Sequence, residues 1–138
     1  MRVGETMSHH VVSVPHYATL VEASELMRNH DIGFLPVTSS DMLVGVVTDR
    51  DIVVRGIGEG KNPYITEVQS VMSTKPLCCY EDDVLTDAAD MMSANHVQRL
   101  VVIDDNNKLA GLLSVDDLAA HMSSDRALGD LLRNVRAA

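Results

Sequence analysis

The chain repeats itself, and this internal repeat limits the folds open to it more than any other feature of the sequence. With an offset of 65 residues, the halves align at Val3/Val68, Met7/Met72, Ser8/Ser73, Leu20/Leu85, Ala23/Ala88, Met27/Met92, Leu35/Leu100 and Val37/Val102. After one extra residue in the turn near Asn106, Gly45, Thr48 and Asp51 align with Gly111, Ser114 and Asp117. Because the matches keep their order and need one gap, we interpret the chain as a tandem repeat.

Each half predicts the order strand, helix, strand, strand, helix, which gives a mixed α+β (α/β) fold. In the first half the elements are a strand at 11–14, a helix capped by Thr19 and Glu22, strands at 34–38 and 43–47, and a helix at 49–56. In the second half they are a strand at 77–80, a helix starting near 85, strands at 99–103 and 109–113, and a helix at 115–122. Because a repeat of roughly 57 residues is marginal alone, we expect the two to pack with pseudo-twofold symmetry as one module.

These elements divide the chain into repeat 1 (1–60), repeat 2 (61–124) and a C-terminal helical tail (125–138). Residues 58–63 contain two glycines and a proline and predict a linker loop. The tail places Leu128, Leu131, Leu132 and Val135 at helical spacing, so it could dock on the core or on a second subunit.

Charge narrows the possible partners. Eleven Lys and Arg against twenty Asp and Glu give a net charge of −9, which disfavours nucleic acid, as does an aromatic content of 3%. No apolar run approaches the roughly 20 residues of a membrane span. Residues 1–13 lack a cationic start followed by an apolar stretch, so we expect no signal peptide and a cytoplasmic location.

The strongest local motif is Gly-x-x-[Thr/Ser]-x-x-Asp, which follows a predicted strand in each half. It reads Gly45 to Asp51 in the first half and Gly111 to Asp117 in the second. A hydroxyl followed three residues later by a carboxylate caps a helix. The same groups, beside the free N–H groups of a helix start, could also bind the diol of a ribose. Capping and ribose binding are compatible.

Taken together, these motifs resemble the CBS (cystathionine β-synthase) motif, and the pair resembles a tandem CBS, or Bateman, module. The residues that carry the resemblance are the leaders Val3–Met7 and Val68–Met72, the run Ile32–Val37, the segment Leu43–Ile52 and the two motifs above, within residues 3–124. The form is similar to stand-alone bacterial and archaeal CBS-pair proteins, including hypoxic-response types. The resemblance implies a regulatory module, not an enzyme, with two clefts between the repeats. It further implies an adenine ligand (AMP, ADP, ATP or S-adenosylmethionine), no required cofactor, a homodimer and an effector protein that the sequence does not name.

The resemblance also implies site residues, which we assign position by position. Thr48, Asp51, Ser114 and Asp117 match ribose-contacting positions. The positions that contact the adenine or form the cleft walls are matched by Val12, Ser13, Val14, Ile32, Gly33, Phe34, Pro36, Leu77, Cys78, Cys79 and Val97. Gln98 and Arg99 match positions that contact phosphate. Arg50 is a further candidate cation, and Arg55, Lys61 and Lys75 are candidates of lower rank. Val101 departs from the family, which usually has Pro there, as the first half has at Pro36.

Three alternatives stay open. Catalysis is disfavoured because the sequence has no H-E-x-x-H, G-x-S-x-G or P-loop motif. A metal-binding module would need His9, His10 and His16 to converge with Cys78 or Cys79, and we assign no metal residues. A CBS pair without ligand would serve as a dimerisation scaffold. The adjacent cysteines predict two reduced thiols, one buried and one near a surface or pocket, with redox sensing as the alternative.

Overall fold

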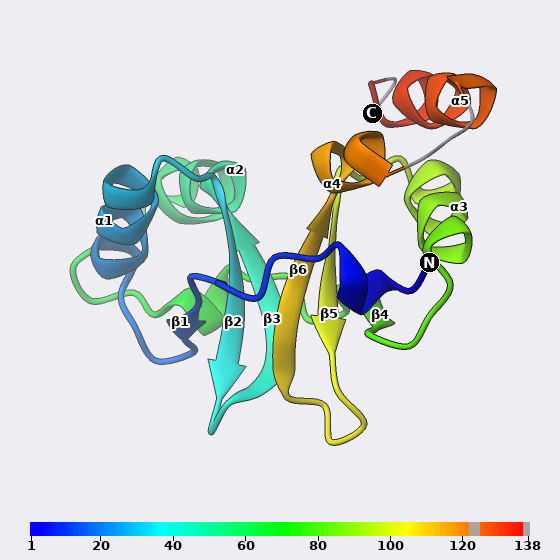
Figure 1. Ribbon diagram of the computed structural model, residues 1–138. Helices are drawn as coiled ribbons and strands as arrows, with labels where there is room; N and C mark the ends of the chain where they lie inside the picture. Colours follow the sequence, from blue (N-terminus) through cyan, green and yellow to red (C-terminus); the bar gives the residue numbers. More distant parts are fainter. Residues whose placement is uncertain (122–124, 137–138) are drawn as a thin grey trace. The chain divides into compact units, whose positions relative to one another are not determined.

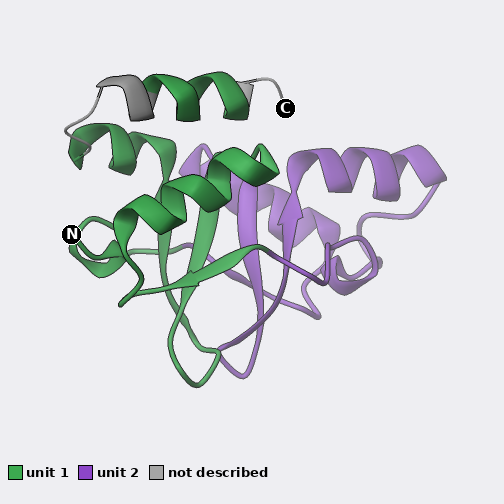
Figure 2. Ribbon diagram, turned by 90° about the vertical axis from the view of Figure 1, so that its right-hand side faces the viewer, with its two compact units in different colours: residues 1–11, 77–138 green, residues 12–76 purple. Residues whose placement is uncertain are grey.

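The computed structural model describes residues 1–121 and 125–136 and divides into two compact units. Unit 1 comprises Met1–Val11 and Leu77–Ala138, and unit 2 comprises Val12–Pro76 (Figure 2). The predicted end of the last helix of repeat 2, at Met122, lies outside the described residues, as do the other positions in 122–124 and 137–138. No helix in the described part of the chain combines the length and the apolar character of a membrane span.

Unit 2 is built on a three-stranded sheet of order β1-β2-β3, in which β1 runs parallel and β3 antiparallel to β2. Its elements are β1 (Val14–Pro15), α1 (Leu20–His30), β2 (Phe34–Ser39), β3 (Met42–Thr48), α2 (Asp49–Asp51), the π-helical η2 (Ile52–Gly56), and the 3₁₀ turns η3 (Ile57–Glu59) and η4 (Val68–Ser70) (Figure 1). The prediction of a strand at 11–14 is wrong in its bounds, because β1 begins only at Val14 and ends at Pro15. The predicted linker loop starts after the 3₁₀ turn η3.

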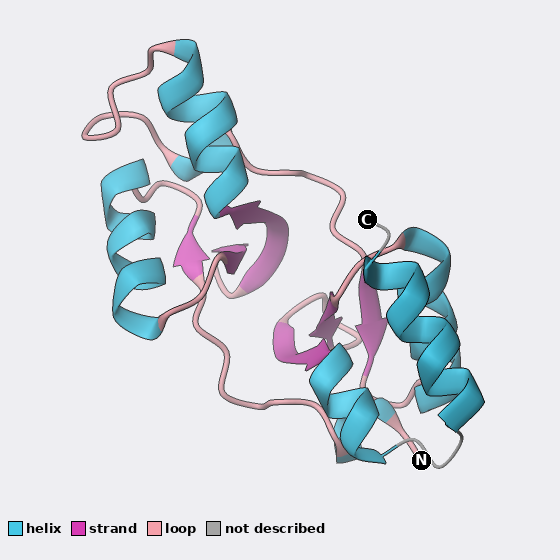
Figure 3. Ribbon diagram, turned by 90° about the horizontal axis from the view of Figure 1, so that it is seen from above, coloured by secondary structure: helices cyan, strands magenta, loops and turns pink. Residues whose placement is uncertain are grey.

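Unit 1 repeats this plan, with sheet order β4-β5-β6 and the same parallel and antiparallel pairings. Its elements are the 3₁₀ turn η1 (Val3–Glu5), β4 (Cys78–Tyr80), α3 (Leu85–Asn95), β5 (Arg99–Ile103), β6 (Leu109–Ser114), α4 (Val115–His121) and α5 (Asp125–Arg136). The predicted tail helix is α5. The mixed α+β class and the repeated element order are confirmed, and Figure 3 shows the strands of each unit with helices beside them.

Turn and cap residues set the element boundaries. Thr19 and Glu22 form the predicted capping box of α1: Oγ1 of Thr19 accepts from the Glu22 amide at 3.2 Å, and Oε1 of Glu22 accepts from the Thr19 amide at 3.3 Å. α1 and α3 both end at a residue in the left-handed region, Asp31 (φ 53°) and His96 (φ 55°), which lets the chain turn into the next strand.

The leader of each repeat packs in the unit that holds the strands of the other repeat. Residues 1–11 belong to unit 1, where Ser8 and Leu112 exchange amide-to-carbonyl hydrogen bonds of 2.9 and 3.0 Å. In unit 2, Ser73 and Val46 exchange bonds of 2.9 and 3.0 Å in the same way. The compact units therefore divide the chain after residues 11 and 76. The predicted boundary between the sequence repeats, after residue 60, is a different division of the chain.

This docking explains the glycine that opens each motif. A Cβ built on Gly45 would lie 2.6 Å from the carbonyl oxygen of Ser73, and one on Gly111 would lie 2.7 Å from that of Ser8. Real Cβ atoms do not come so close to backbone, so the leader can pair with β3 or β6 only where the strand carries glycine.

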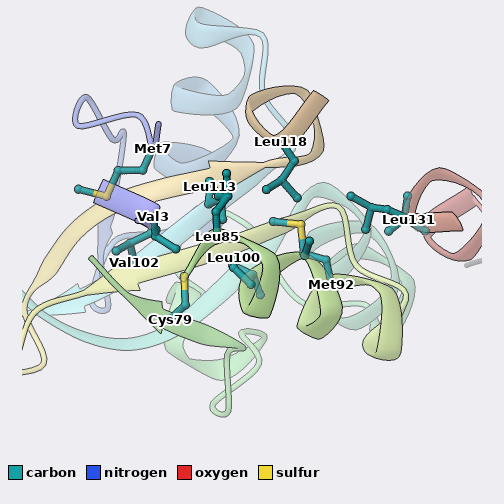
Figure 4. Packing of buried hydrophobic residues seen from close by; sticks show 13 residues of the cluster. Val3, Met7, Cys79, Leu85, Met92, Leu100, Val102, Leu113, Leu118 and Leu131 are labelled. Atoms are coloured by element: carbon teal, nitrogen blue, oxygen red, sulfur yellow. The ribbon is translucent and has the colours of Figure 1, made fainter. Parts of the chain in front are cut away.

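Each unit has its own apolar core. In unit 1 the leader contributes Val3 and Met7, which pack with Cys79, Leu85, Met92, Leu100, Val102, Leu113, Leu118 and Leu131 (Figure 4). In unit 2 the cluster includes Leu20, Leu35, Val37 and Val47, together with Val68 and Val71 of the other leader. The leaders therefore supply buried core residues as well as backbone hydrogen bonds.

Candidate functional site

Both motif carboxylates sit at the start of a helix, where they complete a capping box. In unit 2, Oδ2 of Asp51 accepts from the Thr48 amide at 3.0 Å, and Oγ1 of Thr48 accepts from the Asp51 amide at 3.1 Å. Oδ1 of Asp51 lies 3.9 Å from Nε of Arg55, whose Nη1 also donates to the Val71 carbonyl at 3.2 Å. Arg55, one of the reserve phosphate partners, is therefore held by Asp51 and by the docked leader.

The second motif repeats this geometry in unit 1. Oδ2 of Asp117 accepts from the amide of Ser114 at 2.9 Å and from its hydroxyl at 3.1 Å, and the Asp117 amide donates to Ser114 Oγ at 3.2 Å. His121 stands where Arg55 stands in the first repeat. Since the cap uses Oδ2 alone, it leaves Oδ1 of Asp117 for a further donor. The capping interpretation of both motifs is confirmed.

A pocket of about 190 Å³ in unit 1 brings together three residues that the sequence assigned to a ligand, Gln98, Arg99 and Ser114. Arg99 and Ser114 are paired across β5 and β6, and the Val115 amide donates to the Gln98 carbonyl at 3.0 Å, which fixes the entry to α4 beside them. The other lining residues are Val115, Asp116, Leu132 and Val135, which the sequence analysis did not assign to a site. The helical spacing of Leu132 and Val135 was visible in the sequence, but nothing there indicated that α5 forms a wall.

Arg99 gives this pocket a cation that is available to a ligand. The side chain is exposed, and among the residues that the structure describes no carboxylate forms an ion pair with it. A guanidinium beside a hydroxyl and an amide side chain is suited to the oxygens of a phosphate. The Asp116 carboxylate lines the same pocket and disfavours a negatively charged ligand group close to it.

The equivalent positions of unit 2 carry different groups. Gly33 and Phe34 replace Gln98 and Arg99, and Asp49 replaces Val115. The Asp49 carboxylate lies so close to Gly33 that a Cβ there would be 2.5 Å from its Oδ2. Arg50 is exposed and is the candidate cation within the first motif, while Lys61 lies 3.8 Å from Glu59. The two repeats thus share the cap and differ in the groups that would meet a phosphate.

The other predicted wall residues lie at varied depths. In unit 2, Val14 and Pro36 are buried, while Val12, Ser13, Ile32 and Phe34 are partly exposed. In unit 1, Leu77 is exposed, and Cys78 and Val97 are half-buried. Val101, in the place where the family usually has Pro, is buried in β5 and pairs with Cys78 and Leu112.

The cysteines differ in depth as expected: Cys79 is buried and Cys78 is partly exposed. Burial, with smaller contributions from Asp83 and Cys78, raises the pKa of the Cys79 thiol to about 12. Burial also raises the pKa of Cys78. Both thiols therefore stay protonated at neutral pH, which disfavours the redox-sensor alternative because the thiolate is the reactive form.

The candidate metal ligands are divided between the two units. His9, His10, Cys78 and Cys79 belong to unit 1 and His16 belongs to unit 2. Across residues 1–121 and the described part of α5, no three His, Cys, Asp or Glu side chains are placed to hold a metal ion together.

Comparison with known proteins identifies the family. The family model described as "CBS domain" matches twice, at residues 3–57 and 68–124. The CBS domain-containing protein YhcV of Bacillus subtilis (strain 168) is 35% identical over 133 residues, which are 96% of this chain and 94% of that protein. A crystal structure of Hypoxic Response Protein I with two coordinated zinc ions superposes with a TM-score of 0.80 at 29% identity, over 88% of this chain and 99% of the other.

A second solved structure, that of CBSX2 in complex with AMP, gives a TM-score of 0.76 at 28% identity and covers 86% of this chain and 93% of CBSX2. These matches and the two family-model hits cover both repeats and the motif of each. The chain therefore belongs to the CBS-domain family and carries two CBS domains in tandem.

Proposed function

We propose that this protein is a regulatory, non-catalytic module that binds an adenine nucleotide and relays its occupancy to an effector protein. The observation that carries the proposal is the pocket of unit 1, which joins Arg99 and Gln98 to Ser114 beside the capped carboxylate of Asp117. The AMP bound to CBSX2, a relative of the same family, supports a nucleotide as the ligand class.

Each group in this assignment has a chemical role. Oδ1 of Asp117 accepts the ribose hydroxyls, because a carboxylate can take two O–H donors. Arg99 and Gln98 donate to the phosphate, and the Ser114 hydroxyl donates to it or to the ribose. In unit 2, Thr48 and Asp51 take the ribose roles and Arg50 the phosphate role, with Asp51 shared with Arg55. We infer that the second repeat holds the tighter phosphate site.

We also infer that the protein forms a homodimer through η2 and the start of η3, the segments that follow the first motif. Val53, Val54 and Ile57 there are 60%, 49% and 51% exposed, which is unusual for three neighbouring large apolar side chains. Replacing Val53 and Ile57 with Ser should convert the dimer to a monomer in light scattering. If the double variant keeps the mass of the wild type, this surface is not the interface.

The test of the proposed function is a thermal-melt screen of the whole protein with AMP, ADP, ATP, S-adenosylmethionine and zinc. A nucleotide at a hundred times its dissociation constant stabilises the protein by about 2.7 kcal/mol. The Asp117→Ala variant should lose most of this gain. Because Asp117 also caps α4, Glu22→Ala in the capping box of α1 is the matched control: it should lower the melting temperature and leave the ligand-induced shift intact.

The alternatives predict other outcomes. A dimerisation scaffold without ligand would show no shift with any nucleotide. A metal-binding module would shift with zinc and not with nucleotides. A shift with one adenine compound that survives Asp117→Ala and Asp51→Ala together would contradict the assigned site residues.

A further inference from the structure

The pocket of unit 1 holds one charge of each sign. Among the described residues that line it, Arg99 carries the only positive charge and Asp116 the only negative charge. Both side chains are exposed, and within the described part of the chain no ion pair joins them. A ligand in the pocket therefore meets the cation and the anion as separate groups.

The backbone fixes the positions of the two charges. Arg99 begins β5 and pairs with Ser114, the last residue of β6. Asp116 follows two residues later, in the first turn of α4. The Val115 amide donates to the Gln98 carbonyl at 3.0 Å, which ties the start of α4 to the residue before β5. The two charges thus stand on elements that are hydrogen-bonded to each other.

Helix α5 supplies an apolar wall and no further cation. Leu132 and Val135 line the pocket, whereas the exposed Arg133 between them pairs with Asp130 on the same helix. Within the described lining, a negatively charged group that does not reach Arg99 finds no second positive partner.

This wall is attached to unit 1 by packing and by hydrogen bonds. Val135 is 3% exposed and joins the core cluster that contains Ala89. The Nδ1 of His96 bonds to the Asn134 carbonyl at 2.7 Å, and the Asn134 side-chain amide donates to the Ser93 hydroxyl. The apolar wall is therefore part of the folded unit.

The first repeat carries the opposite charge at the same place. Arg50 is the equivalent of Asp116, and Phe34 is the equivalent of Arg99. The cap of α4 does not require an acid at 116, because Asp117 completes it with Ser114. A carboxylate in a first turn favours the helix dipole, but that contribution does not depend on lining a pocket.

We propose that Asp116 is a specificity-determining residue that makes this pocket prefer a nucleoside monophosphate to a di- or triphosphate. This inference rests on the proposed function and deepens it. One phosphate can contact Arg99, whereas each further phosphate adds negative charge that Asp116 repels and no second cation neutralises. Because Asp116 is exposed, water and salt screen the repulsion, so the preference is several-fold and not absolute.

The test compares AMP and ATP affinities of the full-length wild type, Asp116→Asn and Asp116→Arg by calorimetry at low salt without added Mg²⁺. The affinities are those of the binding that Asp117→Ala removes, which assigns them to unit 1. The wild type should prefer AMP. Asp116→Asn should raise the affinity for ATP relative to AMP at least about threefold, the size of one like-charge contact near the surface. Asp116→Arg, which copies Arg50, should raise it further.

Asp87→Asn is the matched control. Asp87 is exposed in the first turn of α3 and does not line the pocket. This variant removes the same charge from the protein and from the start of a helix, so it should keep the wild-type ratio of ATP to AMP affinity.

A wild-type ratio in both Asp116 variants, or an equal change in Asp87→Asn, would overturn the selectivity. If that happens while Asp117→Ala still abolishes AMP binding, the proposed function stands and only this inference fails. If the wild type binds neither AMP nor ATP, both proposals fail for these nucleotides.

Discussion

Gly111 packs against the side chain of Met7: a Cβ on Gly111 would be 2.7 Å from the sulfur of Met7. Gly45 has the same relationship to Met72, also at 2.7 Å. Each pair joins the leader of one repeat to the motif strand of the other, so each motif glycine serves the pairing of a leader with a strand.

Alanine at either glycine should therefore destabilise the protein. We expect Gly111→Ala and Gly45→Ala each to lower the free energy of unfolding by about 1–3 kcal/mol, the usual cost of overpacking, measured by urea denaturation. Gly129→Ala is the control, since among the side chains that the structure describes a Cβ there meets only Arg133 Nη1, at 3.9 Å, and alanine favours helix. If the motif variants are as stable as this control, close approach is not the reason for the glycines.

Variants of two helix caps, Ser114 at α4 and Thr19 at α1, should distinguish an effect on protein stability from an effect on AMP binding. Ser114→Ala removes the hydroxyl that caps α4 and should cost about 1 kcal/mol of stability while also weakening AMP binding. Thr19→Ala should cost a similar amount and leave the AMP affinity unchanged. Melting curves and calorimetry on the same samples check both. Unchanged AMP affinity in Ser114→Ala would leave capping as the only role of the hydroxyl.

Arg99 should discriminate a phosphorylated ligand from a bare nucleoside. Arg99→Gln removes a charge-assisted hydrogen bond of about 1.5–3 kcal/mol, so AMP binding should weaken by roughly 10- to 150-fold while adenosine binding stays unchanged. Arg28→Gln, an exposed position on α1, is the charge-matched control. An equal loss for AMP and adenosine would show that Arg99 does not meet the phosphate.

Cys79 should be unreactive and should make stability fall at alkaline pH. The folded protein holds the thiol proton up to about pH 12, whereas the unfolded chain releases it near pH 9. The stability from burying the neutral thiol is therefore complete below pH 9 and is lost progressively as the pH rises from about 9 toward 12. Urea denaturation of the wild type should show a steeper alkaline decline than that of Cys79→Ala. Parallel declines, or rapid labelling of Cys79 by a thiol reagent at pH 7.5, would contradict the raised pKa.

Much of the fold could be predicted because its signals are local. The capping box at Thr19 and the strand at 99–103 depend on residues that are close in sequence, and the structure has them as expected. Strand 11–14 was predicted from its run of valines. The structure begins β1 at Val14, since the pairing with β2 starts there.

The candidate site was predictable only on its motif side. Arg99 and Ser114 meet at one pocket because paired strands carry them, Gln98 directly precedes the first of these strands, and the sequence pattern indicates such pairing. The wall formed by Leu132 and Val135 depends on where a distant helix docks. That choice is set by the small side chain of Ala89 and by the polar contacts of Ser93 and His96, which periodicity alone does not reveal.

Because the leaders are exchanged, a fragment that contains one repeat lacks part of its own core. A protein fragment that ends after residue 60 would hold β1, β2 and β3 without the second leader, which supplies Val68 and Val71 to their core. The complementary fragment would lack Val3 and Met7. Neither half of the gene encodes a finished folding unit. A single CBS repeat would need the leader of a second copy to complete its core, and the tandem chain supplies that leader within one molecule.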